Sequence, residues 1–365
     1  MIQKITNFLK KDIVLSISMC LAIFSCFVSP PGPDYLKYID FHTLILLFCL
    51  MLVIEGLNEE SFFQYTGNRI LSVVSTTKGL VFSLVFFCFI SSMIITNDVA
   101  LITFVPFGLM LLGASGMQAS VCLTVTLMTV AANLGSMFTP IGNPQNLYLF
   151  SLSGMDLKSF FSLMLPYTLA AAGLLILFVF LGFRQTKTKL KLKTTGTIDF
   201  HKIPLYLFLF ALCILTVAKL IPHIILLAVT CCCIFYKKRN LFRRIDYTLL
   251  LTFIFFFIFV GNLKHLEWLH QALLNILAGH ERMFSIAASQ VISNVPAAML
   301  LSGYTDQIQE LIIGTNIGGL GTLIASMASL ISYRQIAARY PKQKKQYLLT
   351  FTIVNVIFLG VLLLI

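Results

Sequence analysis

Long apolar runs separated by short polar segments dominate the sequence. Several runs reach the roughly 17–25 residues that an α-helix needs to cross a bilayer. Alternating apolar and polar positions, which would predict half-buried strands, are not the prevailing pattern. The sequence therefore predicts an all-α polytopic membrane protein. We expect full spans near residues 12–29, 40–57, 118–150, 159–183, 204–220, 222–236, 246–263, 308–332 and 346–365.

Two further apolar stretches, 79–113 and 282–303, each carry a polar break in the middle. The breaks are Thr96-Asn97-Asp98 and Ser293-Asn294. Non-helical backbone at membrane depth is stable only where it is buried inside protein or lines a cavity. We expect each stretch to be a re-entrant hairpin that returns to the side it entered from.

Composition and charge placement support a membrane protein. Of 365 residues, 58% are apolar and 11% are charged, well below the roughly 25% charged residues of soluble domains. The net charge of +12 could indicate nucleic-acid binding, but its basic residues lie in short loops. With a cytoplasmic N-terminus, 21 of 26 Lys and Arg residues fall inside, as the positive-inside rule requires. We expect an inner (plasma) membrane protein with its C-terminus outside, lipid contacts and no nucleic-acid partner. The nine Cys residues show no metal or disulfide spacing.

The sequence contains a weak internal repeat. Ile39-Asp40-Phe41 matches Ile245-Asp246-Tyr247, the two hairpin breaks match each other, and the seven residues from Asn133 match those from Asn316. The predicted topology makes the copies inverted, a hallmark of secondary transporters. We expect residues 1–183 to form the first repeat, 184–221 a basic cytoplasmic linker with a connecting span, and 222–365 the second repeat.

Each repeat also contains a candidate discontinuous helix, 118–150 in the first and 308–332 in the second. Glycine and proline weaken or end the helix in the first stretch, and three closely spaced glycines weaken it in the second. The second half of a broken helix offers free N–H groups to an anion. Carbonyls of the first half, with Asn and Thr oxygens, suit Na⁺. The candidate binding residues are Thr96, Asn97, Asp98, Asn133, Thr139, Gly142, Asn143, Asn146, Ser293, Asn294, Asn316, Gly318 and Thr322.

Asp98 is the one carboxylate expected deep in the membrane, and no Lys or Arg is expected at that depth. An intramembrane carboxylate is a functional candidate by default. It either handles a transported cation or proton or caps the returning hairpin helix. We expect no bound cofactor or resident metal; a transported Na⁺ would lie near Asn97, Asp98 and Asn294.

These residues resemble the ion-transporter superfamily, which includes divalent anion:sodium symporters, citrate carriers, arsenite permeases and Na⁺/H⁺ antiporters. The most specific marks are the segment from Thr139 to Asn146 and the two Asn-containing hairpin tips. The symporters carry Ser-Asn-Thr at each tip, whereas this chain ends its tips in Asp98 and Val295. The acidic first tip is similar to the arsenite-permease and antiporter branch. The resemblance implies a homodimer and a rigid-body elevator movement.

The sequence thus predicts a transporter and not an enzyme. We expect cation-coupled transport of a small anion, such as a citrate-like carboxylate, by alternating access with Na⁺ or H⁺ as coupling ion. The alternative is a Na⁺/H⁺ antiporter or an arsenite permease. An intramembrane hydrolase would need a deep second catalytic group, and ATP-driven transport would need a P-loop, which the sequence lacks.

Overall fold

The computed structural model describes residues 13–365 except 28, 33–34, 72–73, 188–201 and 264. The basic stretch 188–201 of the predicted linker, and the N-terminal basic residues, lie outside the described residues. Across the described part the chain is helical, and its one β feature is an isolated bridge between Thr76 and Lys187. The predicted all-α class is confirmed.

Five described helices are long and apolar enough to cross a membrane, or six if the α12 and α13 segments, bent by 87°, form one span. Large apolar side chains also remain exposed on the outer helices, including Leu169 and Phe180 on α10 and Leu349 and Ile353 on α19. Lipid is the solvent in which such faces are stable. The chain is an integral, multi-pass membrane protein.

The first part of the chain contains a hairpin and a broken helix between two long helices. These elements are α4 (Phe41–Glu59), α5 (Phe62–Leu71), α6 (Thr77–Ser92), α7 (Asn97–Ala114), α8 (Val121–Ser136), α9 (Pro144–Ser153) and α10 (Leu157–Gly182). Side chains fix the helix starts: Asp40 accepts a hydrogen bond from Thr43 N at 3.1 Å, and Thr76 accepts one from Gly79 N.

A second set of helices follows in the same order of element types. These are α13 (Tyr247–Leu263), α14 (Glu267–Leu277), α15 (Glu281–Ile292), α16 (Asn294–Leu301), α17 (Ile308–Ile317), α18 (Met327–Arg339) and α19 (Lys344–Leu362). The remaining helices are α2 (Ile13–Ser25), α3 (Tyr35–Tyr38), α11 (Ile203–Val217) and α12 (His223–Lys238). The inverted relation of the two sets remains a proposal.

Some helix bounds differ from the predicted ranges. The first hairpin runs from Thr77 to Ala114, close to the predicted 79–113, whereas the second half of the later broken helix continues to Arg339, beyond the predicted end at 332. Arg334 therefore lies in a helix. The apolar run ends before the helix does, because the residues that follow it, including Arg334 and Gln335, are good helix formers.

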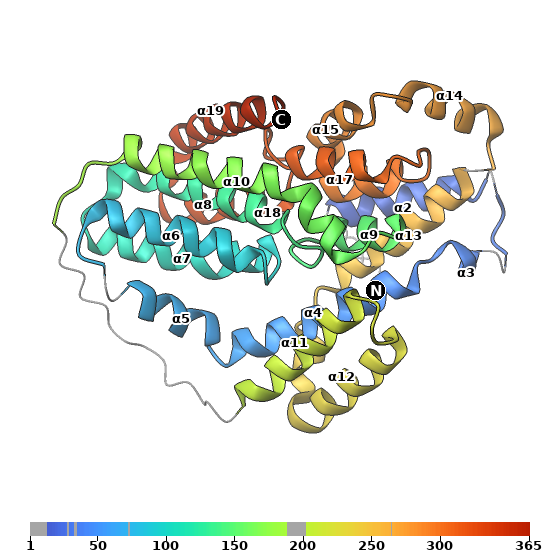
Figure 1. The fold of residues 1–365 in the computed structure, drawn as a ribbon, viewed down its shortest axis with the longest axis horizontal. Helices are drawn as coiled ribbons and strands as arrows, with labels where there is room; N and C mark the ends of the chain where they lie inside the picture. The colour runs from blue at the N-terminus through green and yellow to red at the C-terminus, as the bar shows by residue number, and fades with distance from the viewer. Residues whose placement is uncertain (1–12, 28, 33–34, 72–73, 188–201, 264) are drawn as a thin grey trace.

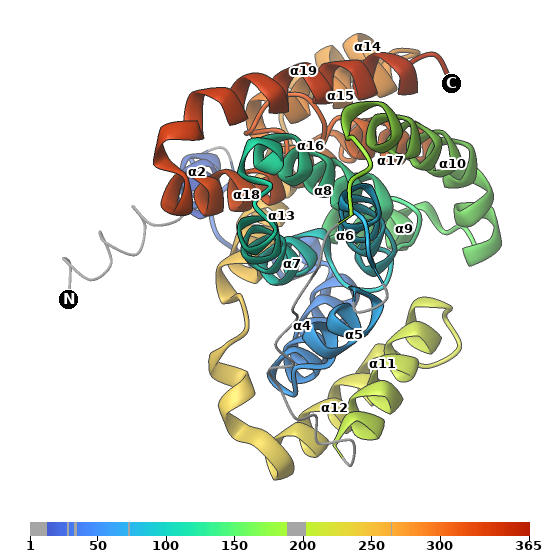
Figure 2. The same ribbon diagram turned by 90° about the vertical axis from the view of Figure 1, so that its left-hand side faces the viewer.

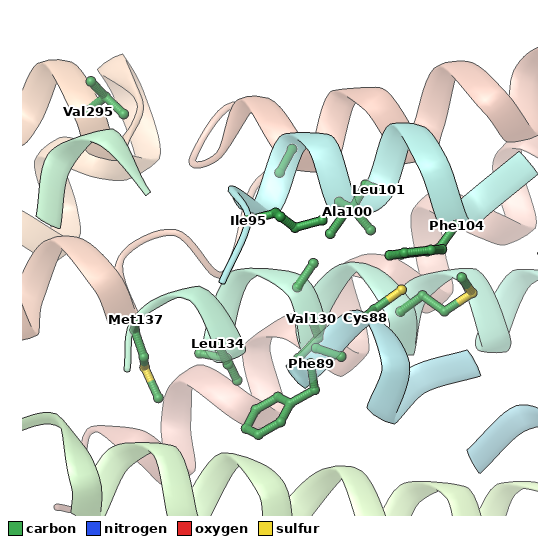
Figure 3. Close-up of a cluster of buried hydrophobic side chains, with 14 of the residues drawn as sticks. Cys88, Phe89, Ile95, Ala100, Leu101, Phe104, Val130, Leu134, Met137 and Val295 are labelled. Atoms are coloured by element: carbon green, nitrogen blue, oxygen red, sulfur yellow. The ribbon is translucent and has the colours of Figure 1, made fainter. Parts of the chain in front are cut away.

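The helices form two groups (Figures 1 and 2). Helices α4, α5, α11 and α12 lie together on one side of the molecule. The other group is α6–α10 and α15–α19, and it meets the first where α4 contacts α9 and α5 contacts α6 and α7. Helix α13 packs against α2 and also contacts α4 and α16, so it touches both groups. The two arms of the first hairpin share a core with α8. Figure 3 shows this core, built from Cys88, Phe89, Ala100, Leu101, Phe104, Val130 and Leu134.

Candidate substrate and ion site

The first helix break lies between α8, which ends at Ser136, and α9, which begins at Pro144. Asn143 is the N-cap of α9, and its side chain accepts a hydrogen bond from Asn146 N at 2.9 Å. The Asn146 amide donates to the carbonyls of Met137 and Thr139, both at 3.2 Å. The Met137 and Thr139 carbonyls, which were expected to bind Na⁺, therefore each accept a hydrogen bond from the Asn146 side chain.

The second break lies between α17, which ends at Ile317, and α18, which begins at Met327. Gln290, on hairpin arm α15, donates from Nε2 to the Gly318 and Leu320 carbonyls, both at 2.9 Å. Its Oε1 accepts from Thr322 N at 2.9 Å. The side-chain amide of Gln290 therefore binds the backbone of the second break, as the side-chain amide of Asn146 binds the backbone of the first.

Each hairpin tip is bound to a break through its backbone. Asn97 N donates to Gly142 O at 3.2 Å, and Asn294 N donates to Ala325 O at 3.0 Å. At Gly142 a side chain would place its Cβ 2.2 Å from Ser136 O, so this close turn requires glycine. The tips and breaks therefore form one hydrogen-bonded unit in each half of the chain.

Buried asparagines connect the two halves. Asn143 Nδ2 donates to Asn316 Oδ1 at 3.1 Å, and Asn316 Nδ2 donates to Asn146 Oδ1 at 2.5 Å. Asn97 Nδ2 donates to Asn133 Oδ1 at 3.1 Å, which also accepts from Ser326 Oγ at 3.0 Å. We call Asn97, Asn133, Asn143, Asn146 and Asn316 the amide cluster. Each is at most 5% exposed.

The structure places the other predicted residues around this cluster. Ser293 and Asn294 form the second hairpin tip, where Ser293 Oγ lies 3.4 Å from Ala325 O. Thr139 and Thr322 do not join the cluster. Thr139 Oγ1 donates to Met93 O at 2.5 Å and Thr322 Oγ1 to Gln290 O at 3.1 Å, so both hydroxyls tie a break to a hairpin arm.

Asp98 faces a cavity of about 200 Å³ between α4, α7, α9 and α13. Thr96, which caps α7, lines the same cavity. The charged lining comprises Glu55, Asp98, Arg244 and Asp246. Among the described residues, Arg244 is the one basic residue in this lining. Arg244 precedes α13 and was assigned to a loop, but its long side chain reaches the cavity.

Sequence reasoning missed three groups of this site: Gln290, Arg244 and the Ser326–Ser329 turn. Gln290 could have been noticed, because it is a polar residue within a predicted hairpin, four positions before Asn294. The role of Arg244 carried no local signal, since it lies within the basic run 237–244.

A protein-family model described as "Citrate transporter" matches residues 1–310. The chain belongs to this citrate transporter family. Among similar proteins is the transporter MJ0456 of Methanocaldococcus jannaschii, 33% identical over 300 residues and covering 81% of each chain. The inner membrane protein YbiR of Escherichia coli is 29% identical over 88% of this chain and 86% of its own length. The rice silicon efflux transporter LSI3 is 30% identical over a shorter region, which covers 39% of this chain and 29% of LSI3.

Membership of the citrate transporter family settles the class of activity. The family is one of transporters, and MJ0456 and LSI3 are named as transporters, so this chain is a transporter and not an enzyme. The predicted relation to the ion-transporter superfamily is confirmed at this level.

Proposed function

We propose that the chain is a cation-coupled secondary transporter of a small anion, with a citrate-like carboxylate as the leading substrate and Na⁺ or H⁺ as coupling ion. The observation that carries the proposal is the amide cluster. Five buried asparagines from α7, α8, α9 and α17 meet at the two helix breaks. Amide N–H groups can bind carboxylate oxygens, and amide carbonyls can bind a cation.

The family supports a carboxylate substrate, because it is described as one of citrate transporters. The start of α18 supports an anion site, since its N-cap Ser326 makes no capping hydrogen bond and its hydroxyl donates to Asn133 instead. The uncapped first turn leaves helix N–H groups to a ligand. Asp98 supplies the negative charge for the coupling ion.

The two-part fold supports alternating access. The cavity lies between α4 and α13 on one side and α7 and α9 on the other. It reaches Thr96 and Asp98 at the hairpin tip, so it gives one route towards the site. In the proposed cycle the hairpins and broken helices move against α4 and its neighbours to open the opposite route. The implied homodimer belongs to this proposal.

Asp98→Asn tests the coupling role. Thr96, and not Asp98, is the N-cap of α7, so the substitution leaves the cap in place, removes the charge and keeps the shape of the side chain. In proteoliposomes, Na⁺ or a pH gradient should stimulate the initial rate of citrate uptake by a factor about ten times smaller in Asp98→Asn than in the wild type. That loss corresponds to about 1.4 kcal/mol of coupling. The measurement is uptake rate against Na⁺ concentration and against pH.

Asp156→Asn is the matched control. Asp156 caps α10, is exposed, and its pKa is lowered by the hydrogen bonds it accepts from Ser159, so it carries a charge at neutral pH. This variant should keep wild-type coupling. Asp98→Asn curves that superimpose on wild type would reduce Asp98 to the first turn of α7 and remove the cation part of the proposal.

A second candidate function is efflux of a neutral oxyacid, or Na⁺/H⁺ exchange. The cavity favours it, because three carboxylates and one guanidinium disfavour an anion on that route. LSI3 is named a silicon efflux transporter, and a Dictyostelium discoideum relative is named a putative arsB transporter. The same proteoliposomes, tested with arsenite, silicic acid and a pH gradient without citrate, distinguish the candidates by which solute moves.

A further inference from the structure

The cavity beside Asp98 contains a basic group that the proposed function leaves without a role. Arg244 lies between α12 and α13 and lines this cavity with Asp98, Glu55 and Asp246. Helix α4 contributes Glu55, helix α7 contributes Asp98, and the start of α13 contributes Asp246. These four are the charged groups that face one another across about 200 Å³.

Arg244 is held loosely where it stands. Its Nη1 lies 3.5 Å from Glu55 Oε1, and its Nη2 lies 3.8 Å from Glu59 Oε1. Strong pairs between a cation and a carboxylate are closer, about 2.7–2.9 Å. Glu59 is also paired with Lys238 at 3.2 Å, so it depends less on Arg244. A guanidinium that is 51% exposed and weakly paired can change partner at small cost.

The carboxylate of Asp98, in contrast to the guanidinium of Arg244, has no partner among the described residues. Within the described residues it has neither an ion pair nor a hydrogen bond, and the hydrogen bond that Asp98 makes to Asn97 Oδ1, at 2.9 Å, is donated by its backbone N–H. Asp98 is half-buried in the lining of a cavity, where an ionised carboxylate is stabilised by a counter-charge. A cation bound at Asp98 and the guanidinium of Arg244 both provide one. Their like charges make the two arrangements mutually exclusive.

We propose that Arg244 is a positioning residue that competes with the transported cation for Asp98 and pairs with Glu55 when the cation is bound. The proposal rests on the proposed function in taking Asp98 as the cation site, and it commits to Na⁺. The cavity would then have two states. In one state the cation is bound at Asp98 and Arg244 pairs with Glu55. In the other state no cation is bound and Arg244 pairs with Asp98. Only the differential pairing of Arg244 shifts the balance between them.

The proposal predicts opposite effects for the two partners of one ion pair. Arg244→Gln removes the competitor, so Na⁺ should bind more tightly. Glu55→Gln removes the partner that Arg244 has when the cation is bound and leaves Arg244 to Asp98, so Na⁺ should bind more weakly. If the Arg244–Glu55 pair only stabilised the fold, breaking it from either side would shift binding in the same direction.

The test is equilibrium binding of ²²Na⁺ to the purified full-length protein in lipid nanodiscs. Arg244→Gln should lower the dissociation constant by about fivefold or more, and Glu55→Gln should raise it by a similar factor, the lower end of typical coupling between linked sites. The double variant Glu55→Gln/Arg244→Gln should match Arg244→Gln, because Glu55 acts only through Arg244. Arg244→Lys, which keeps the charge, should stay within about twofold of wild type.

Arg243→Gln is the matched control, since Arg243 is the neighbouring cation, lies at the end of a 3₁₀ turn and does not line the cavity. It should bind Na⁺ as wild type does. Shifts in the same direction for Arg244→Gln and Glu55→Gln, or no shift in either, would overturn the competition. Absence of ²²Na⁺ binding by the wild type would overturn it as well.

Failure of the proposed function has a different signature. If Asp98→Asn keeps ²²Na⁺ binding, Asp98 is not the cation site and both proposals fail. If Asp98→Asn abolishes binding while Arg244→Gln and Glu55→Gln bind normally, the competition alone fails. Melting temperatures of all variants, measured in the same nanodiscs, identify any variant that has failed to fold.

Discussion

At the residue scale, Ser293 has a backbone conformation that non-glycine residues rarely adopt. Its φ is 74° and its ψ is 153°, at the tip of the second hairpin. This region belongs almost entirely to glycine, and a side chain there costs about 1–3 kcal/mol. The hydrogen bond from Asn294 N to Ala325 O holds the strained turn in place. Strain of this kind is concentrated at binding sites and switches, which supports a functional tip.

Ser293→Gly and Ser293→Ala separate the strain from the hydroxyl. Both variants lose the hydroxyl, but only glycine relieves the backbone. We expect Ser293→Gly to be more stable than Ser293→Ala by about 1 kcal/mol, after the entropic cost of glycine is deducted. Thermal unfolding in detergent measures the difference. Ser289, inside α15, is the control, where alanine should be the more stable replacement. Equal stabilities at position 293 would mean that the turn is not strained.

The residues of the site were predictable by type, but their partners were not. Asn133, Asn143 and Asn316 stand out as polar residues near glycine and proline in apolar stretches. The contact between Asn143 and Asn316 joins positions 173 residues apart, and no local pattern encodes that distance. Likewise the sequence indicates free carbonyls at each break, while the donors that occupy them, Asn146 and Gln290, depend on tertiary packing.

At the element scale, the first broken helix depends on close packing against the hairpin. A Cβ on Gly135 would lie 2.1 Å from Phe89 O and 2.5 Å from Ser92 Oγ. Helices α6 and α8 therefore approach as closely as their backbones allow, an arrangement typical of small residues in membrane helix pairs. This contact sets the position of Asn133, two residues earlier, against the hairpin tip.

Gly135→Ala should separate α6 from α8. The added methyl group would clash with backbone atoms, which cannot move aside as a side chain can. We therefore expect the free energy of unfolding to fall by about 1–3 kcal/mol. Gly173→Ala on α10 is the control, because nothing lies within 4 Å of its added Cβ. That variant should be neutral or slightly more stable. Melting temperatures of the two purified variants make the comparison. A Gly135→Ala protein as stable as Gly173→Ala would contradict the close packing.

Helix positions followed well from apolar runs, whereas helix ends did not. The break between α8 and α9 was expected between Asn133 and Asn146, and it lies between Ser136 and Pro144. Proline and an asparagine cap fix that boundary locally. The end of α18 has no such signal, because polar helix formers continue the helix beyond the apolar run.

At the scale of the whole molecule, the two ends of the helix bundle differ in charge. At one end α6 begins where α10 ends, since Thr77 N donates to Thr186 O at 2.9 Å, and α8 begins beside Gln343. This end carries the basic segments 184–187 and 342–345. At the other end α15 and α17 begin together, joined by Arg282 and Glu310 at 2.8 Å. The basic end is the one we expect in the cytoplasm.

Cysteine labelling tests this orientation. In a background without native cysteines, Thr195→Cys should resist a membrane-impermeant maleimide on intact cells, because residue 195 belongs to the basic linker, outside the described residues. Asp306→Cys should react, since Asp306 is exposed in the loop between α16 and α17 at the opposite end. Both should react once detergent opens the membrane, which controls for access. The reverse pattern on intact cells would invert the molecule. Because 21 of 26 basic residues favour one orientation under the positive-inside rule, we expect Thr195→Cys to be protected and Asp306→Cys to react. Arg244 lines the Asp98 cavity and belongs to the basic segment 237–244, so this orientation would put that part of the lining on the cytoplasmic side.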